Sequence, residues 1–263
     1  MSLAAVGRWR AHPLCGPAAG WPTEFWGPEA LDPEAWRALA ALLAPDEELA
    51  ALVEALAGAR DVVDVGGGTG LLTRTLAARI GPVIVVEPSA EQRAHAPRVG
   101  GLTLVPGRAE ALPLADRAVD AAVATWVLQY TDDPAAAVDE LARVARSHVA
   151  IVQAAPTNQL VDVYGACAAV AGLPAAHHGW LVAHAAARLE AHGFAVALRS
   201  VAIPVIVPTT MTAAALADIL VGLHFGGHPA NGAMRAAVTP RIAAYLAGEH
   251  RLIDDGVLLI ARR

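Results

Sequence analysis

Residues 62–70, with the sequence VVDVGGGTG, constrain the fold more strongly than any other part of the chain. The run Val62–Val65 is short and, apart from Asp64, apolar and β-branched, as expected of a buried strand. The glycines that follow allow a tight turn and a close approach to a ligand; they are Gly66, Gly67, Gly68 and Gly70. A strand, a glycine-rich turn and a helix in this order predict a ligand site at the carboxyl end of an α/β sheet.

Apolar strand-like runs and helical segments alternate on both sides of this loop. We predict helices at 33–43, 45–57, 71–80, 89–96 and 133–146, and further strands at 83–86, 102–105, 118–125 and 148–153. Beyond residue 155 the pattern loosens: we predict helices within 156–193 and 209–247, a strand or broken pair at 194–207, a break at 224–228 and a last strand at 257–261. Continuous apolar strands alternating with helices predict a parallel sheet covered on both faces.

Composition excludes several classes of protein. The 263 residues contain no lysine, which excludes Schiff-base chemistry and a phosphate-binding P-loop. The net charge is −6 and no arginine cluster appears, so we predict no nucleic-acid partner. Cys15 and Cys167 lie far apart without a CxxC pair, which argues against a disulfide or a zinc site. We find no apolar membrane span and no signal peptide, and expect a cytoplasmic protein without a membrane partner.

Two types of cofactor fit a glycine-rich loop at this place in an α/β sheet. The dinucleotide fingerprint G-x-G-x-x-G/A would place its third glycine at Leu71 or at Thr73, so that pattern fails. Glu87, directly after the second strand, is well placed to accept hydrogen bonds from ribose hydroxyls.

The loop resembles instead the first motif of class I S-adenosylmethionine-dependent methyltransferases, in which Asp64, Gly66, Gly68 and Gly70 match residue by residue. The resemblance implies that the glycine loop lies against the amino-acid part of S-adenosyl-L-methionine and that Glu87, followed by Pro88, binds the ribose. Residues 105–113 resemble the family's G-[DTR]-A-E-x-L-P stretch along the adenine, which assigns Ala109 and Glu110 to the cofactor site. Arg108 stands where many relatives carry an adenine-contacting Asp. Thr125, which ends the fourth strand, is also assigned to the cofactor site.

The resemblance also implies an architecture for the whole chain. We expect one α/β domain over 1–263, a doubly wound, mainly parallel seven-stranded sheet with an N-terminal helical cap and C-terminal helical insertions. Its parts would be a cap or lid at 1–57, a cofactor-binding core at 58–155, and substrate-side insertions with the last strands at 156–263.

The segment after the fourth strand, Thr125 to Tyr130, narrows the choice of acceptor. It lacks the Asn/Asp-Pro-Pro-aromatic motif of amino-group methyltransferases and the Pro-Cys of cytosine-carbon methyltransferases. Asp133 precedes Pro134 and is explained as a helix N-cap, so we predict no metal. The small-molecule group that includes the ubiquinone and menaquinone type remains.

Several residues are candidates for the acceptor site. As catalytic residues we name Gln129, Tyr130 and His178, and as substrate-binding residues Trp21, Trp26, Trp126, His177 and His224. His228 lies in the same insertion as His224. Ordinary loop packing explains the residues after the fourth strand equally well, and a lone histidine is more often a hydrogen-bonded residue than a base. Trp21 and Trp26 form either an aromatic lid or a structural staple.

We therefore predict S-adenosylmethionine-dependent methyl transfer to a small-molecule acceptor, an aromatic or apolar secondary metabolite. O-, N- and C-methylation stay open, as does a homodimer. The alternatives are a nicotinamide-dependent oxidoreductase and a non-catalytic S-adenosylmethionine-binding protein on the same fold.

Overall fold

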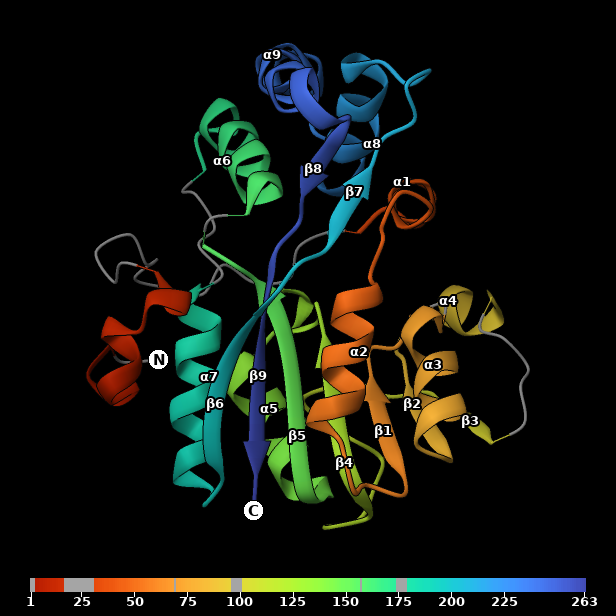
Figure 1. Cartoon of the computed structure of the whole chain (residues 1–263), viewed down its shortest axis with the longest axis vertical. Coiled ribbons are helices and arrows are strands. Elements are labelled where there is room, and N and C mark those ends of the chain that lie inside the picture. The colour runs from red at the N-terminus through yellow and green to blue at the C-terminus, as the bar shows by residue number, and fades with distance from the viewer. Residues whose placement is uncertain (1–2, 17–30, 69, 96–100, 157, 174–178) are drawn as a thin grey trace.

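The computed structural model describes residues 3–16, 31–68, 70–95, 101–156, 158–173 and 179–263. Its centre is a seven-stranded sheet in the order β3-β2-β1-β4-β5-β9-β6 (Figure 1). The strands are β1 (Val62–Val65), β2 (Val83–Val86), β3 (Leu102–Val105), β4 (Val119–Thr125), β5 (Ala145–Ala154), β6 (Ala195–Val201) and β9 (Gly256–Arg262). All neighbours pair in parallel except β9, which is antiparallel to both β5 and β6. This order confirms the predicted doubly wound, mainly parallel sheet.

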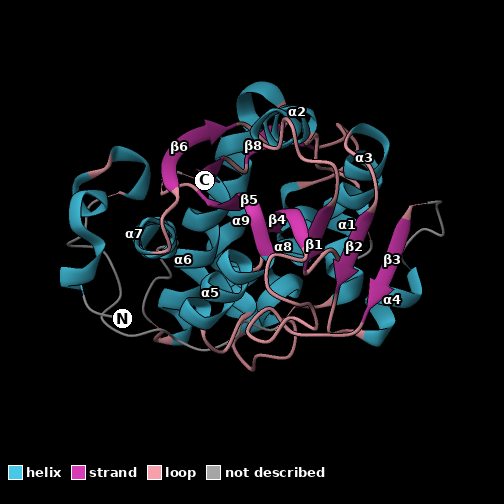
Figure 2. Cartoon of the chain, turned by 90° about the horizontal axis from the view of Figure 1, so that it is seen from below, coloured by secondary structure: helices cyan, strands magenta, loops and turns pink. Residues whose placement is uncertain are grey.

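Helices cover both faces of the sheet, as the continuous apolar strands require (Figure 2). One face packs against α2 (Asp46–Ala55) and α3 (Leu71–Arg79). The other packs against α5 (Pro134–Val144) and α7 (Gly179–Ala191). The short helix α4 (Ala90–His95) follows β2. Because successive residues of a strand point to opposite faces, Val62 enters the first core and Val63 the second.

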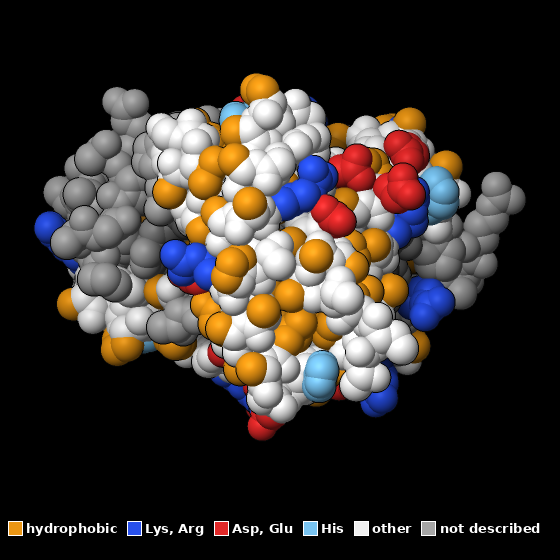
Figure 3. Space-filling model, turned by 90° about the horizontal axis from the view of Figure 1, so that it is seen from above, with side chains coloured by type: hydrophobic (Ala, Val, Ile, Leu, Met, Phe, Trp, Pro, Cys, Tyr) orange, Lys and Arg blue, Asp and Glu red, His pale blue; other side chains and the backbone are white. Residues whose placement is uncertain are grey.

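A second lobe, which we call the cap lobe, lies above the carboxyl ends of the parallel strands (Figure 1). It consists of α1 (Pro33–Ala40), α6 (Gln159–Ala171), α8 (Ala213–Phe225), α9 (Asn231–Glu249) and the ribbon β7 (Pro204–Ile206) with β8 (Arg251–Ile253). These elements share a hydrophobic core that is distinct from the two cores of the sheet, with Leu39, Val163, Leu220 and Val238 fully buried in it. On its outer face apolar side chains lie scattered between charged ones (Figure 3).

The ribbon continues the antiparallel pair of β6 and β9 into the cap lobe. Pairing in the sheet ends at Val201 with Gly256 and resumes at Pro204 with Ile253. In between, the Asp254 N–H donates to the Ile203 carbonyl at 3.0 Å. The sequence did not predict β8, because three residues between a helix and two aspartates carry no alternating pattern.

The described segments of the predicted N-terminal part, residues 1–57, lie in three different places. Of the described part, the 3₁₀ turns η1 (Leu3–Ala11) and η2 (Pro13–Cys15) pack against α7, α1 joins the cap lobe, and α2 lies on the sheet. The Trp9 indole donates to Glu190 of α7 at 2.8 Å. Each of these segments buries its apolar side chains against a different part of the protein, so segments that are neighbours in the chain lie apart in the structure.

Among the described helices, none combines the length and the hydropathy needed to cross a bilayer. Cys15 and Cys167 are both buried and form no disulfide within the described residues, and burial raises the pKa of each thiol, to about 12 and about 11.

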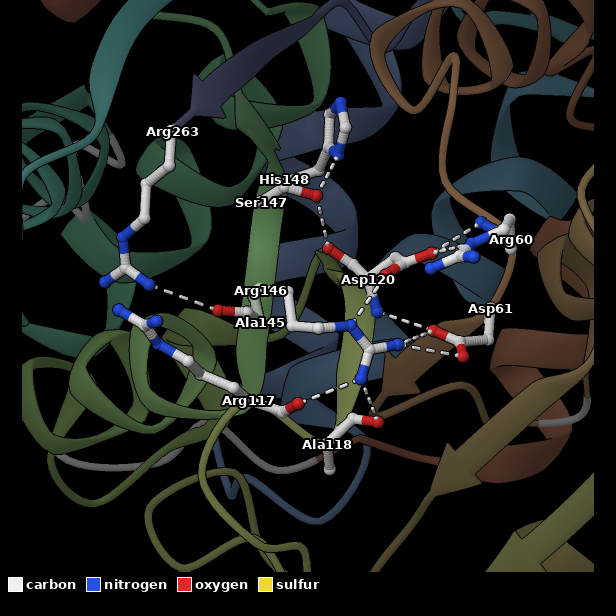
Figure 4. Close-up of polar contacts among 10 residues, drawn as sticks. All are labelled: Arg60, Asp61, Arg117, Ala118, Asp120, Ala145, Arg146, Ser147, His148 and Arg263. Carbon is white, nitrogen blue, oxygen red and sulfur yellow. Dashed lines mark hydrogen bonds and ion pairs between the residues drawn. The ribbon is translucent and has the colours of Figure 1, made fainter.

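The opposite edge of the sheet, at the start of the parallel strands, is held by a network of ion pairs (Figure 4). Asp120 accepts hydrogen bonds from the Arg60 Nε at 3.0 Å and from the Arg146 Nε at 2.6 Å. Arg146 also bonds both carboxylate oxygens of Asp61. Arg60 and Arg146 hold the pKa of Asp120 well below its usual range. The network ties β4 and β5 to the residues that precede β1.

We expect Asp120→Asn to lower the free energy of unfolding at pH 7 by about 1–3 kcal/mol, because charge-assisted hydrogen bonds are lost in a shielded position. A carboxyl whose pKa is lower in the folded than in the unfolded state stabilises the fold at pH values above its unfolded pKa. This stabilisation is lost as the pH falls. The difference between wild type and variant should therefore shrink as the pH falls below about 3.8. Urea unfolding at several pH values measures it.

Asp116→Asn is the matched control, since the Asp116 side chain is 80% exposed and also pairs with an arginine, Arg143. It should change stability by less than about 1 kcal/mol. Equal effects of the two substitutions would show that the network does not stabilise this edge.

Candidate cofactor and acceptor site

The glycine loop turns directly above β1. Gly66 has a φ of 70°, and its N–H donates to the Val86 carbonyl of β2 at 2.7 Å. A Cβ at this position would lie 2.6 Å from the Val127 Cγ2. Only glycine satisfies both the left-handed backbone and this close approach. Gly70, with a φ of 79°, ends the loop as the N-cap of α3.

Asp64, in β1, carries a buried carboxyl next to this loop, with 1% of the residue exposed. Its Oδ2 accepts a hydrogen bond from the Thr73 hydroxyl at 2.5 Å, whereas its Oδ1 has no partner among the described residues. Burial raises the pKa of Asp64 to about 6; the Thr73 bond lowers it and the charge of Glu87 raises it. The site thus holds an acid with an unused acceptor atom.

Glu87 follows β2 and fastens the loop to it. Its Oε2 accepts from the Gly68 N–H at 3.1 Å, and its Oε1 accepts from the Ser89 N–H at 2.8 Å. Each carboxylate oxygen has a second lone pair, so Glu87 can also accept from the hydroxyls of a ribose. Pro88, the next residue, is exposed.

The predicted adenine stretch is tied to the loop after β4. Glu110 Oε1 accepts from the Arg108 guanidinium at 3.2 Å and from the Asp132 N–H at 2.7 Å, and Arg108 also pairs with the Asp132 carboxylate. Ala109 is buried in the core. Arg108 therefore bridges two acids here.

Trp126 follows Thr125, which ends β4, and turns toward α2. Its backbone has a φ of 59°, and its indole N–H donates to Glu48 Oε1 at 3.0 Å. Burial raises the pKa of Glu48 to about 7; the Trp126 bond lowers it and the charge of Asp254 raises it. The indole packs with the α2-side core, whereas Leu128 enters the α5 and α7 core. Sequence reasoning missed Glu48, which looked like an ordinary first-turn acid of a helix.

Tyr130 and His224 come together where the sheet meets the cap lobe. The Tyr130 and His224 rings lie 6.1 Å apart between centroids, and Tyr164 of α6 stands edge-on to His224 at 4.8 Å. Phe225 and His228 extend the group. We call Tyr130, Tyr164 and His224 the aromatic cluster. Tyr164 was not foreseen, because a tyrosine within a helical apolar stretch gives no sign of its neighbours.

The remaining candidates lie outside the group or outside the described part. Gln129 is buried, and its Oε1 has no partner among the described residues. Trp21, Trp26, His177 and His178 lie outside the described residues, so their predicted roles stay predictions. Within the described ranges, no group of three or more His, Cys, Asp or Glu residues could hold a metal ion.

Part of the chain is similar in sequence to known methyltransferases. Residues 63–152 match the family described as "Methyltransferase domain". Over 94 residues the chain is 42% identical to an uncharacterized methyltransferase of Mycobacterium tuberculosis, a match that covers 34% of this chain and 37% of that protein. Over 90 residues it is 36% identical to a 2-methyl-6-phytyl-1,4-hydroquinone methyltransferase of Oryza sativa subsp. japonica, covering 32% of this chain and 26% of that protein. The chain therefore matches about a third of the length of these curated relatives.

Among solved structures, the YcgJ protein of Bacillus subtilis superposes with a TM-score of 0.58 at 16% identity, covering 83% of this chain and 98% of that chain. At this identity the likeness shows the fold. It confirms the sequence prediction of a doubly wound, mainly parallel sheet.

The buried carboxyl of Glu48 predicts an unusual pH dependence. A carboxyl whose pKa is raised by folding stabilises least when ionised, so its contribution falls as the pH rises from about 4.5 to about 7. Glu48→Gln keeps an acceptor for the Trp126 indole and removes the charge. We expect it to be more stable than wild type at pH 8, by about 1–3 kcal/mol, and nearly equal at pH 4.5.

Urea unfolding of both proteins at pH 4.5, 6 and 8 checks this prediction, with the exposed Glu34→Gln as the control. A pH-independent difference between wild type and Glu48→Gln would contradict it.

Proposed function

We propose that this chain, whose residues 63–152 match the methyltransferase domain family, is a class I enzyme that transfers a methyl group from S-adenosyl-L-methionine to a small molecule bound between the sheet and the cap lobe. The observation that carries the proposal is the pair of buried acids around the glycine loop. Asp64 is the last residue but one of β1, Glu87 directly follows the neighbouring strand β2, and the Gly68 N–H donates to Glu87.

These acids fit S-adenosyl-L-methionine better than a dinucleotide. The cofactor carries an ammonium and a sulfonium, and the Asp64 Oδ1 is a buried acceptor without a described partner. A pyrophosphate would instead bring negative charge toward two carboxylates. In this assignment Gly66, Gly67 and Gly68 lie along the amino-acid part, Glu87 binds the ribose, and Ala109 and Glu110 border the adenine. When bound, the cofactor supplies an activated methyl group on its sulfur.

The chain's own task is then to align the acceptor and to exclude water. The aromatic cluster offers ring faces from both lobes, which suits an aromatic or apolar acceptor. The rice relative is named for a hydroquinone acceptor, which supports the same class. For a hydroxyl acceptor, a ring nitrogen of His224 is the group in the cluster that can take the proton.

A lysine-free, alanine- and arginine-rich composition is typical of a GC-rich bacterial genome, and we propose a cytoplasmic role on a secondary metabolite.

Binding of S-adenosylhomocysteine tests the cofactor assignment. Wild type should bind it with a Kd in the micromolar range, and Asp64→Asn and Glu87→Gln should each weaken binding about tenfold or more, because each removes a charged hydrogen-bond acceptor. Isothermal calorimetry measures all three, with the exposed Glu91→Gln of α4 as a control that binds like wild type. A folded wild type that binds NADH and no S-adenosylhomocysteine would contradict the proposal.

Turnover tests the acceptor site. In a screen with labelled methyl groups we expect transfer to uncharged aromatic or apolar molecules. On the acceptor found, His224→Ala should lower kcat by about 10²-fold if the reacting atom is a hydroxyl oxygen, because the base is lost. The KM for S-adenosylmethionine should stay within about twofold, since His224 belongs to the cap lobe. Cofactor binding without any turnover would favour a non-catalytic binding protein.

A further inference from the structure

Gln153 is a buried polar side chain that takes no part in the site described above. It lies next to the last residue of β5, and the residue is 0% exposed. Its backbone is in register with Val257 of β9, but neither its Oε1 nor its Nε2 has a hydrogen-bond partner among the described residues. Its neighbour Val152 packs in the α2-side core, so alternation turns Gln153 to the face of α5 and α7.

Gln129, which follows the neighbouring strand β4, is a second buried glutamine with an unpaired side-chain atom among the described residues. It belongs to the 3₁₀ turn η4 (Leu128–Tyr130) that follows β4, and β4 pairs with β5 up to Thr125 and Val152. The residue is 7% exposed, and its Oε1 has no described partner. Leu128 packs in the core of α5 and α7, and Tyr130 belongs to the aromatic cluster.

Leaving such groups unpaired is costly. A buried polar group without a hydrogen bond costs about 1–3 kcal/mol, whereas an apolar side chain of the same shape costs nothing of this kind. The chain satisfies other buried amides: Asn158 accepts from two backbone N–H groups and donates to Asp254 and to the Asp255 carbonyl. The unpaired glutamine atoms stand at the same edge of the sheet as Asp64, where a ligand meets the fold.

We infer that Gln153 and Gln129 recognise the acceptor, by hydrogen bonds to an uncharged polar group such as a hydroxyl or a carbonyl. The inference rests on the proposed function and names the acceptor's chemistry. An amide offers one acceptor oxygen and two N–H donors, which complement a hydroxyl or a carbonyl. It cannot neutralise a buried charge, which would be strongly unfavourable without a counter-charge. The acceptor's apolar body then lies against the aromatic cluster while its polar group meets the two amides.

Methionine substitutions separate recognition from structure. Gln153→Met and Gln129→Met keep side-chain length and remove the amide. Because both amide atoms of Gln153 and the Oε1 of Gln129 have no hydrogen-bond partner among the described residues, each variant should melt at or above the wild-type temperature. Gln159→Met is the matched control: the Gln159 Oε1 accepts from the Ile253 N–H at 2.9 Å, so its loss should lower the melting temperature.

The binding probe is 1,4-hydroquinone, an uncharged ring with two hydroxyls, added to protein saturated with S-adenosylhomocysteine. We expect it to raise the melting temperature of wild type and of Gln159→Met, and to lose this effect in Gln153→Met and Gln129→Met. The affinity for S-adenosylhomocysteine should stay within about twofold in all four proteins, since the amides are assigned to the acceptor alone.

Two results would overturn the inference while leaving the cofactor assignment intact. One is that all four proteins bind S-adenosylhomocysteine and hydroquinone changes their melting temperatures equally, or changes none of them. The other is a fall in melting temperature for Gln153→Met as large as that for Gln159→Met, which would show that the amide is satisfied internally. Failure of wild type to bind S-adenosylhomocysteine would instead overturn the proposed function.

Discussion

The parallel pairing of β1 between β2 and β4 is the constraint on which the rest of the structure depends. It brings three carboxyl ends to one edge, so Asp64, Glu87 and the segment after Thr125 become neighbours although they lie far apart in the chain. The loop after β1 passes so close to the turn after β4 that a Cβ at Gly66 would clash with Val127. A side chain at Gly66 would push apart the loop after β1 and the turn after β4.

The two edges of the sheet are built on opposite principles. At the start of the strands, Asp61 and Asp120 are matched with Arg60 and Arg146, and the charges stabilise the fold. At the carboxyl ends, burial raises the pKa of Asp64 and Glu48, and amide atoms of Gln129 and Gln153 have no described partner. Such groups lower stability unless a ligand meets them. The contrast within one sheet is a physical reason to place the function at the second edge.

The cap lobe adds the other half of the site. Its own core makes it a packed unit, and the ribbon of β7 and β8 joins it to the sheet as an extension of β6 and β9. The aromatic cluster spans the junction, because Tyr130 follows β4 while Tyr164 and His224 belong to the cap lobe. An acceptor held there would touch both lobes, which is the arrangement that excludes water from methyl transfer.

The sequence by itself determined the central strands of the sheet and the glycine loop. The bounds of β1, β2 and β3, the N-caps Asp32 and Asp133, and the glycine pattern are local, because strand periodicity, capping and turn geometry act over a few residues. Only the tertiary structure decided that Trp126 turns to Glu48, that residues 1–57 divide, that β8 pairs with β7, and that Tyr164 joins His224. These depend on contacts between residues distant in the chain, and no local pattern records which buried face a side chain will meet.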